Sequence, residues 1–198
     1  ALEKLLAIPY FTIVIDPRQT VLSRIRHGST WEPILITAVF GWIQLFSYTF
    51  ATLSFLPLPL ADALPFVAVT LLVGTIIMPI FMTLYLYIAG FVLSFCGMPL
   101  GGQGTSRDLR FALAWAIVPT IYLSMLGAVV GFFMGLSGSV TDPAAIAFSP
   151  LLLLISIVGG IWNFYIQLQC IGAAHRFSAG RAFVTLLIPS IVIFMLFL

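Results

Sequence analysis

Five long apolar runs, separated by short turns, constrain this chain more than any other feature of its sequence. A helix needs about 20 apolar residues to cross the hydrocarbon core of a bilayer. Only 7% of the 198 residues are charged, so lipid must be the main solvent. Because unpaired backbone groups are costly in lipid, the runs must be helical. We expect an all-α polytopic membrane protein, a bundle of five transmembrane helices at about 33–56, 64–96, 109–136, 150–172 and 179–198.

The residues before the first span predict a short helix at the membrane surface. Residues 1–28 form this N-terminal segment, and residues 29–198 form the five-helix domain. Asp16 is a suitable N-cap, Pro17 fits the first helical turn and Gly28 fits a helix stop. A helix between them has an apolar face with the arginines elsewhere, as interfacial amphipathic helices have. We therefore expect the segment to lie in the headgroup region.

Local signals mark where three of the spans begin or bend. Ser29 and Glu32 fit a capping box before the first span, or Pro33 marks its first turn with Trp31 or Glu32 just outside it. Thr105 and Asp108 fit a similar helix start before the third span. The second run is longer than one crossing needs and contains Pro79, so we expect it to tilt, to kink there, or to begin in the interface.

The basic residues predict the orientation in the membrane. Every Lys and Arg falls before the first span, between the second and third, or between the fourth and fifth. The two opposite connections carry only Asp62 and Asp142. Since cytoplasmic loops are enriched in Lys and Arg, we expect a cytoplasmic N-terminus and a C-terminus on the other side. The arginines of the basic side are Arg18, Arg24, Arg26, Arg107, Arg110, Arg176 and Arg181.

Two interpretations of these arginines remain open. They form a ring that contacts anionic lipid headgroups or an acidic partner, or they serve only to set the topology. The expected partners are membrane lipids, anionic ones above all, and either another membrane protein or a second copy of this chain. Nucleic acid is not expected.

A stripe of small residues predicts close helix packing in the third span. Gly127, Gly131 and Gly135 fall four residues apart and therefore lie on one face of a helix. Such a GxxxG face lets another backbone approach closely, so that dispersion holds two helices together in lipid. The partner helix belongs either to this chain or to another one.

Three amides in the apolar runs need partners. Asn163 and Gln167 lie four residues apart on one helical face, and Gln44 lies in the first span. An unpaired amide in hydrocarbon is costly, so these side chains should point into the bundle. They either form hydrogen bonds between helices or line a polar cavity.

No motif for catalysis or for a cofactor is recognisable. The glycines at 101–104 lack the Lys-Ser/Thr pair and the preceding strand of a phosphate-binding loop, so we interpret them as a turn. His27, His175, Cys96 and Cys170 lack paired ligand spacing, and we expect packing roles and no metal site. We expect neither enzymatic activity nor a cofactor. Ionisable residues are predicted near the membrane surfaces, which argues against ion coupling through a buried carboxylate.

Three stretches carry a resemblance to a known family: DPRQT at 16–20, GGQGTSRDLRFALAWAIVP at 101–119 and IWNFYIQLQCIGAAHRFSAGRAFVTLLIP at 161–189. With them the chain resembles the Yip1 domain family of five-span membrane proteins, in its bacterial form. The resemblance implies a compact bundle in the bacterial inner membrane with a cytoplasmic N-terminus. Eukaryotic members are associated with Rab-type GTPases, vesicle traffic and the shaping of ER and Golgi membranes.

The resemblance favours a non-catalytic role in membrane organisation, trafficking or a membrane complex, through helix packing and a basic cytoplasmic face. The alternative is a small-molecule or ion facilitator, or a channel, with a polar pathway near Asn163 and Gln167.

Overall fold

The computed structural model describes residues 9–55, 60–136 and 143–196, and the regular structure of these ranges is helical. The all-helical class is therefore confirmed for them. The loop residue Asp142 and the first eight residues of the predicted N-terminal segment lie outside the described residues. In chain order the elements are α2 (Pro9–Ile15), α3 (Pro17–His27), α4 (Glu32–Phe55), α5 (Leu60–Gly97), the 3-10 turn η1 (Met98–Leu100), α6 (Ser106–Leu136), α7 (Pro143–His175) and α8 (Ala179–Leu196).

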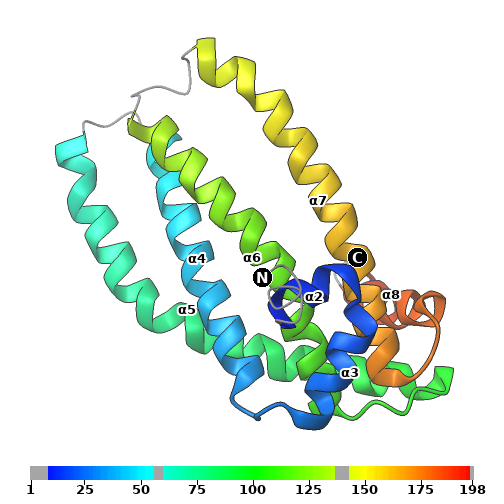
Figure 1. Ribbon diagram of the computed structural model, residues 1–198. Coiled ribbons are helices and arrows are strands. Elements are labelled where there is room, and N and C mark those ends of the chain that lie inside the picture. The colour runs from blue at the N-terminus through cyan, green and yellow to red at the C-terminus, as the bar shows by residue number, and fades with distance from the viewer. Residues whose placement is uncertain (1–8, 56–59, 137–142, 197–198) are drawn as a thin grey trace, which may run out of the picture.

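The helix α6 lies at the centre of the arrangement. Figure 1 shows the first half of α5, then α4, α6 and α7 side by side, with α2 and α3 beside the half in which α6 begins. α6 packs against both α4 and α7. Half of its candidate membrane span is buried inside the molecule, compared with 6% for α5 and 17% for α7. The lipid-facing surface is therefore supplied mainly by the outer helices.

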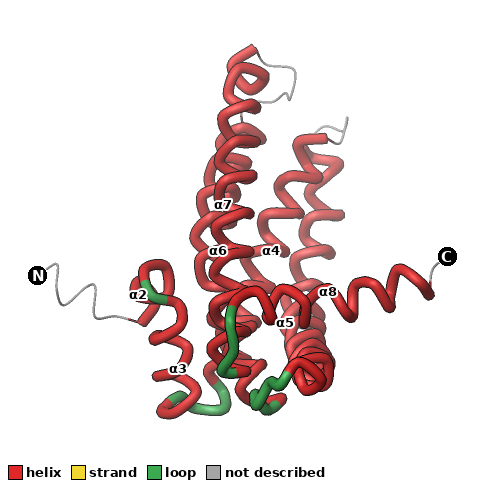
Figure 2. Tube along the Cα trace, turned by 90° about the vertical axis from the view of Figure 1, so that its right-hand side faces the viewer, coloured by secondary structure: helices red, strands yellow, loops and turns green. Residues whose placement is uncertain are grey.

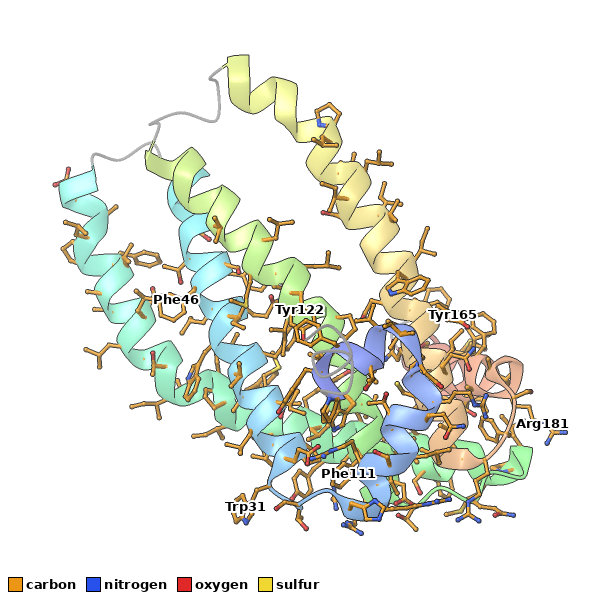
Figure 3. The ribbon with its side chains drawn as sticks, viewed as in Figure 1. Trp31, Phe46, Phe111, Tyr122, Tyr165 and Arg181 are labelled. Carbon is orange, nitrogen blue, oxygen red and sulfur yellow. The ribbon has the colours of Figure 1, made fainter. Side chains whose placement is uncertain are left out.

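The sequence of α6 explains its central position. Ala112, Ala114 and Ala116 are buried in its first half and let neighbouring backbones come close. Between them, Phe111 and Trp115 are only 1% exposed and fill the spaces between helices. The elements α2, α3, α4, α5 and α7 all pack against α6. Figure 3 places Phe111 within this lower part of the bundle, whereas many side chains of the outer halves project outward.

Three helices of the described residues are long and apolar enough to cross a membrane: Asp62–Leu100, Ser106–Gly127 and Leu153–His175. They coincide with the second, third and fourth predicted spans. The first predicted span corresponds to α4 and the last to α8. Figure 2, however, shows α8 crosswise to α4, α6 and α7. The count of five spans therefore stays a prediction.

The helix α5 is bent, as its length and Pro79 predict. Its 38 residues would extend about 57 Å as a straight helix, against a hydrocarbon core of about 30 Å. Figure 1 shows that its first half runs beside α4 and that its second half turns and crosses the bundle. The second half packs against α6 and α8. The bend thus redirects the part of α5 that exceeds the length of one membrane crossing.

A tryptophan from α4 compensates for the proline in α5. Pro79 has no backbone N–H, so the carbonyl of Thr75, four residues earlier, lacks its helical donor. The indole Nε1 of Trp42 donates to this carbonyl at 2.9 Å. Gly41, next to Trp42, allows the approach, because a Cβ there would lie 3.4 Å from the Met78 carbonyl oxygen. The bond therefore joins α4 and α5 at the bend.

We expect Trp42→Phe to lower stability by about 1–3 kcal/mol, because it leaves the Thr75 carbonyl without a donor. Pro79→Ala restores a backbone N–H that reaches the same carbonyl, so Trp42→Phe should cost clearly less in that background. Detergent-unfolding measurements on the four proteins of this double-mutant cycle give the coupling. Equal costs in both backgrounds would contradict the proposed compensation.

Candidate functional site

All seven arginines of the chain lie in α3, in the first turns of α6 and α8, or in the turn after α7. These segments, the start of α4 and the ends of α5 and α7 come together at one end of the molecule. We call this end the basic end. The structure thus gathers the residues that the sequence assigned to one side of the membrane: Arg18, Arg24, Arg26, Arg107, Arg110, Arg176 and Arg181.

Local capping positions the two helices that begin at the basic end. At the start of α3, the Gln19 N–H donates to Asp16 Oδ1 at 3.2 Å. At the start of α6, the Thr105 N–H donates to Asp108 Oδ2 at 3.0 Å. In return the Asp108 N–H donates to Thr105 Oγ1 at 3.2 Å. Both predicted helix starts are confirmed, and α3 ends before Gly28 as expected.

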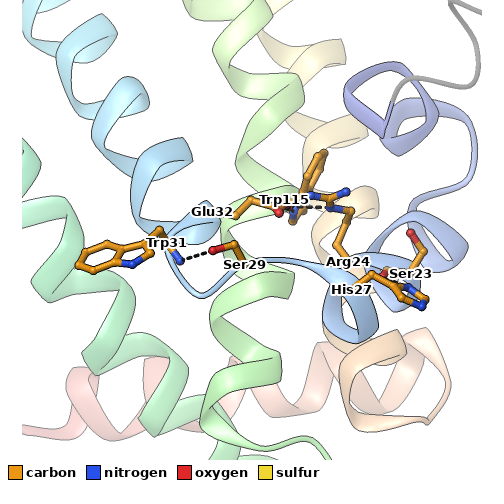
Figure 4. A network of polar contacts seen from close by, with 7 residues as sticks. All are labelled: Ser23, Arg24, His27, Ser29, Trp31, Glu32 and Trp115. Atoms are coloured by element: carbon orange, nitrogen blue, oxygen red, sulfur yellow. Dashed lines mark hydrogen bonds and ion pairs between the residues drawn. The ribbon is translucent and has the colours of Figure 1, made fainter.

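Glu32 joins three elements at the basic end (Figure 4). Arg24 Nε donates to Glu32 Oε1 at 2.7 Å, and Arg24 Nη2 pairs with Glu32 Oε2. Trp115 Nε1 of α6 donates to Glu32 Oε1 at 2.8 Å. The capping-box alternative for Glu32 is therefore wrong, because its carboxylate serves α3 and α6 instead of its own helix start. The other alternative agrees better with the structure, since α4 begins at Glu32 with Pro33 in its first turn. Ser29 retains a long contact, 3.5 Å, from the Trp31 N–H.

The electrostatics of this network favour the charged pair. The hydrogen bond to Glu32 raises the pKa of Arg24, although burial opposes the shift. The Arg24 side chain is 29% exposed and that of Glu32 is 11% exposed, so water screens the pair only partly. Arg24 Cζ also lies 5.5 Å from the ring centroid of Trp115. The network therefore fixes α3 to α4 and α6.

Two further arginines serve the fold. Arg18 donates from Nη2 to the Phe177 carbonyl at 3.0 Å and from Nη1 to Gln169 Oε1 at 3.3 Å. These bonds fasten α3 to the end of α7 and the turn after it. Arg110 lies over the ring of Tyr87, with Cζ 4.2 Å from the centroid, and connects α6 to α5.

Four arginines are exposed: Arg26, Arg107, Arg176 and Arg181. Figure 3 shows Arg181 pointing away from the bundle. Arg107 lies over the Phe111 ring, with 5.5 Å from Cζ to the centroid. Arg176 and Arg181 make long contacts, 3.4 Å to Gln103 Oε1 and 3.5 Å to the Leu100 carbonyl. The predicted basic side therefore divides into arginines that hold the fold and arginines available to a partner.

Arg176 occupies a backbone position that normally suits glycine. Its φ is 60°, in the left-handed region. The Phe177 N–H donates to the Gly172 carbonyl at 2.9 Å and the Arg176 N–H to the Ala173 carbonyl at 3.2 Å. This pair of bonds is the Schellman motif, in which a glycine usually holds the position of Arg176. A non-glycine residue there costs about 1–2 kcal/mol.

The glycine turn after α5 closes around a buried histidine that the sequence interpretation treated as ordinary packing. His175 is fully buried. The Gly104 N–H lies 3.2 Å from His175 Nδ1, and His175 Nε2 lies 3.2 Å from the Leu93 carbonyl. This geometry suits a neutral ring with the proton on Nε2. A Cβ at Gly97 or Gly102 would overlap the ring, so the glycines make room for it.

The structure does not bring the three predicted amides together. Gln44 is in α4, Asn163 and Gln167 are in α7, and α6 lies between these helices. Within the described part of the chain, Asn163 Oδ1 is buried without a hydrogen-bond partner. The largest cavity described here, about 370 Å³ between α2, α4 and α6, is lined by none of the three. The polar pathway stays a prediction.

The predicted glycine stripe faces open space where it is described. A Cβ at Gly127 would meet no described atom within 4 Å, so none of the helices in the described ranges covers that position. The surroundings of Gly131 and Gly135 lie outside the described residues. Close approaches occur instead at isolated glycines: a Cβ at Gly90 would lie 3.1 Å from the Ser106 carbonyl oxygen.

The long apolar helices and the separate basic end define an all-helical integral membrane protein. Among the described residues, no group of three His, Cys, Asp or Glu lies close enough to hold a metal ion. Comparison with protein families finds the Yip1 domain over residues 11–198. The chain therefore belongs to the Yip1 family, which is associated with membrane trafficking and is not known as enzymatic. No curated protein and no solved structure matches it.

We expect Glu32→Gln to lower stability by about 1–3 kcal/mol, because it leaves the partly buried Arg24 without a counter-charge. Removing both charges, with Arg24→Gln and Glu32→Gln together, should cost less than the sum of the single changes. Thermal unfolding in a mild detergent measures all three variants. Additive losses would show that the two side chains act independently.

We expect Gly97→Ala to lower stability by about 1–3 kcal/mol, since the added methyl group overlaps the His175 ring. Gly127→Ala is the matched control, because its methyl group enters open space. That control should be neutral or stabilising by about 0.5–1 kcal/mol through helix propensity. Similar losses of thermal stability in both variants would contradict the described fit around His175.

Proposed function

We propose that this protein is a non-catalytic membrane organiser whose basic end binds the anionic surface of the cytoplasmic leaflet, as a scaffold or a component of a membrane complex. The observation that carries the proposal is the set of four exposed arginines on one end of the bundle. Their four charges add a sizeable attraction, since each Lys or Arg near an anionic surface contributes about 1 kcal/mol.

The helix α3 supports the same proposal. It packs beside α6 and α7, with Thr20 and Val21 buried and Arg26 exposed. Its last turn thereby adds Arg26 to the basic end, where a basic side chain can meet the lipid headgroups. We therefore place the basic end at the cytoplasmic face of a bacterial inner membrane, in agreement with the positive-inside rule. The five-span topology, with the C-terminus on the opposite side, belongs to this proposal.

The open face around Gly127 is the part of the proposal that concerns protein partners. Among the described residues, no atom lies within 4 Å of a Cβ at Gly127 or at Gly160 in α7. Small residues on a helix in lipid allow a helix of another chain to come close. We propose a membrane-protein partner or a second copy as the occupant of the Gly127, Gly131 and Gly135 stripe.

Charge reversal tests the lipid part of the proposal. The double variant Arg107→Glu with Arg181→Glu changes two exposed arginines that hold few internal contacts. Native mass spectrometry of protein purified in a gentle detergent should show a several-fold lower ratio of retained anionic to zwitterionic phospholipid. Asp62→Asn, near the start of α5, is the control for a charge change elsewhere and should leave the ratio unchanged. An unchanged ratio in the arginine variant would refute the proposal.

A further inference from the structure

A small cavity at the basic end collects charged groups from three distant parts of the chain. Its volume is about 80 Å³, and its polar lining consists of Arg26 of α3, Gln103 of the glycine turn, Asp108 of α6 and Arg176 after α7. At about 30 Å³ for each water in the liquid, this is room for two or three water-sized groups. The cavity therefore suits a small polar group and excludes a nucleotide.

The charge balance of the cavity is positive. In the described part of the chain, neither Arg26 nor Arg176 belongs to an ion pair. Asp108 supplies the only carboxylate of the lining, and its Oδ2 accepts from the Thr105 N–H at 3.0 Å and from Thr105 Oγ1 at 2.8 Å. These two bonds hold that oxygen at the start of α6. The two guanidinium groups thus remain available to an anion.

The backbone at Arg176 is an independent sign of a function. The Schellman turn after α7 would accept glycine without strain, yet it holds an arginine with φ 60°. Strained backbone positions of this kind cluster at functional sites, including ligand-binding sites. The turn directs the side chain toward Gln103, whose Oε1 accepts from Arg176 Nη1 at 3.4 Å. A strained position thus places a charge at the cavity.

We propose that this cavity binds a phosphate group through Arg26 and Arg176, presented either by an anionic lipid headgroup or by a soluble phosphate ester. Guanidinium groups match phosphate oxygens with paired, charge-assisted hydrogen bonds. Gln103 adds an amide donor at the rim. The inference rests on the proposed function, in which the basic end meets an anionic membrane surface. It adds one defined phosphate-binding site to the basic end.

Thermal unfolding of the full chain in a neutral detergent tests the site. The probes are short-chain phosphatidic acid, short-chain phosphatidylcholine and inorganic phosphate. At about 100 times its Kd, a bound ligand should raise Tm by about 5–10 °C for a chain of this size. Phosphatidylcholine has no phosphomonoester and should raise Tm much less.

The variant Arg176→Gly separates binding from folding. Glycine adopts the left-handed conformation without steric strain, so this variant should unfold at the same or a higher Tm without ligand. It should nevertheless lose most of the shift that phosphatidic acid causes. Arg26→Gln should lose the shift as well. Arg181→Gln removes an equal charge from the same end but does not line the cavity. It should lose only the small part of the shift that diffuse attraction by the basic end supplies.

The outcomes decide both the site and its ligand. A shift with phosphatidic acid alone supports a lipid headgroup, and an equal shift with inorganic phosphate supports a soluble ester. The site is refuted if neither probe shifts the wild type, or if Arg181→Gln loses as much as Arg176→Gly. That last result means diffuse attraction by the whole basic end, so the proposed function stands while the site does not. An unchanged lipid ratio in the Arg107 and Arg181 charge-reversal variant would refute the proposed function. The phosphate site would then stand on the Tm shifts alone.

Discussion

The close packing around the first turns of α6 is the interaction on which the rest of the structure depends. Five other elements pack against α6, and three buried alanines in its first half let neighbouring backbones come close. Where elements meet, polar groups find partners within the chain: Glu32 accepts from Trp115, and His175 accepts from Gly104. Such pairing matters in lipid, because no water is present there to form hydrogen bonds with an unpaired polar group. Apolar fit and polar pairing thus act at the same place.

The features predicted well from the sequence are those that depend on neighbouring residues. The start of α3 at Asp16, the start of α6 at Thr105 and Asp108, and the bend at Pro79 each follow from local backbone chemistry. The apolar runs predict helices for the same reason, since lipid leaves the backbone no other partner. The family followed from motifs spread along the chain, and the match over residues 11–198 confirms it.

The features that could not be predicted depend on which distant residues meet. Glu32 lies 83 residues from Trp115, and their bond replaces the local capping role that the sequence suggested. Likewise, the glycines around His175 look like a simple turn until α7 places the ring between them. The spaced glycines suggested close packing, but Gly127 is open, whereas the isolated Gly90 meets α6. For the site, the sequence showed which arginines share a side but not which of them stay exposed.

The bond between Trp42 and Thr75 has a consequence for the order in which the chain assembles in the membrane. It joins two helices, so it exists only after α4 and α5 have met. Until then the carbonyl freed by Pro79 faces hydrocarbon without a donor, and inserted α5 carries an energetic defect near its middle. Association with α4 removes the defect. The final bend of α5 is therefore expected to be set during helix association, after insertion, with α4 as its template.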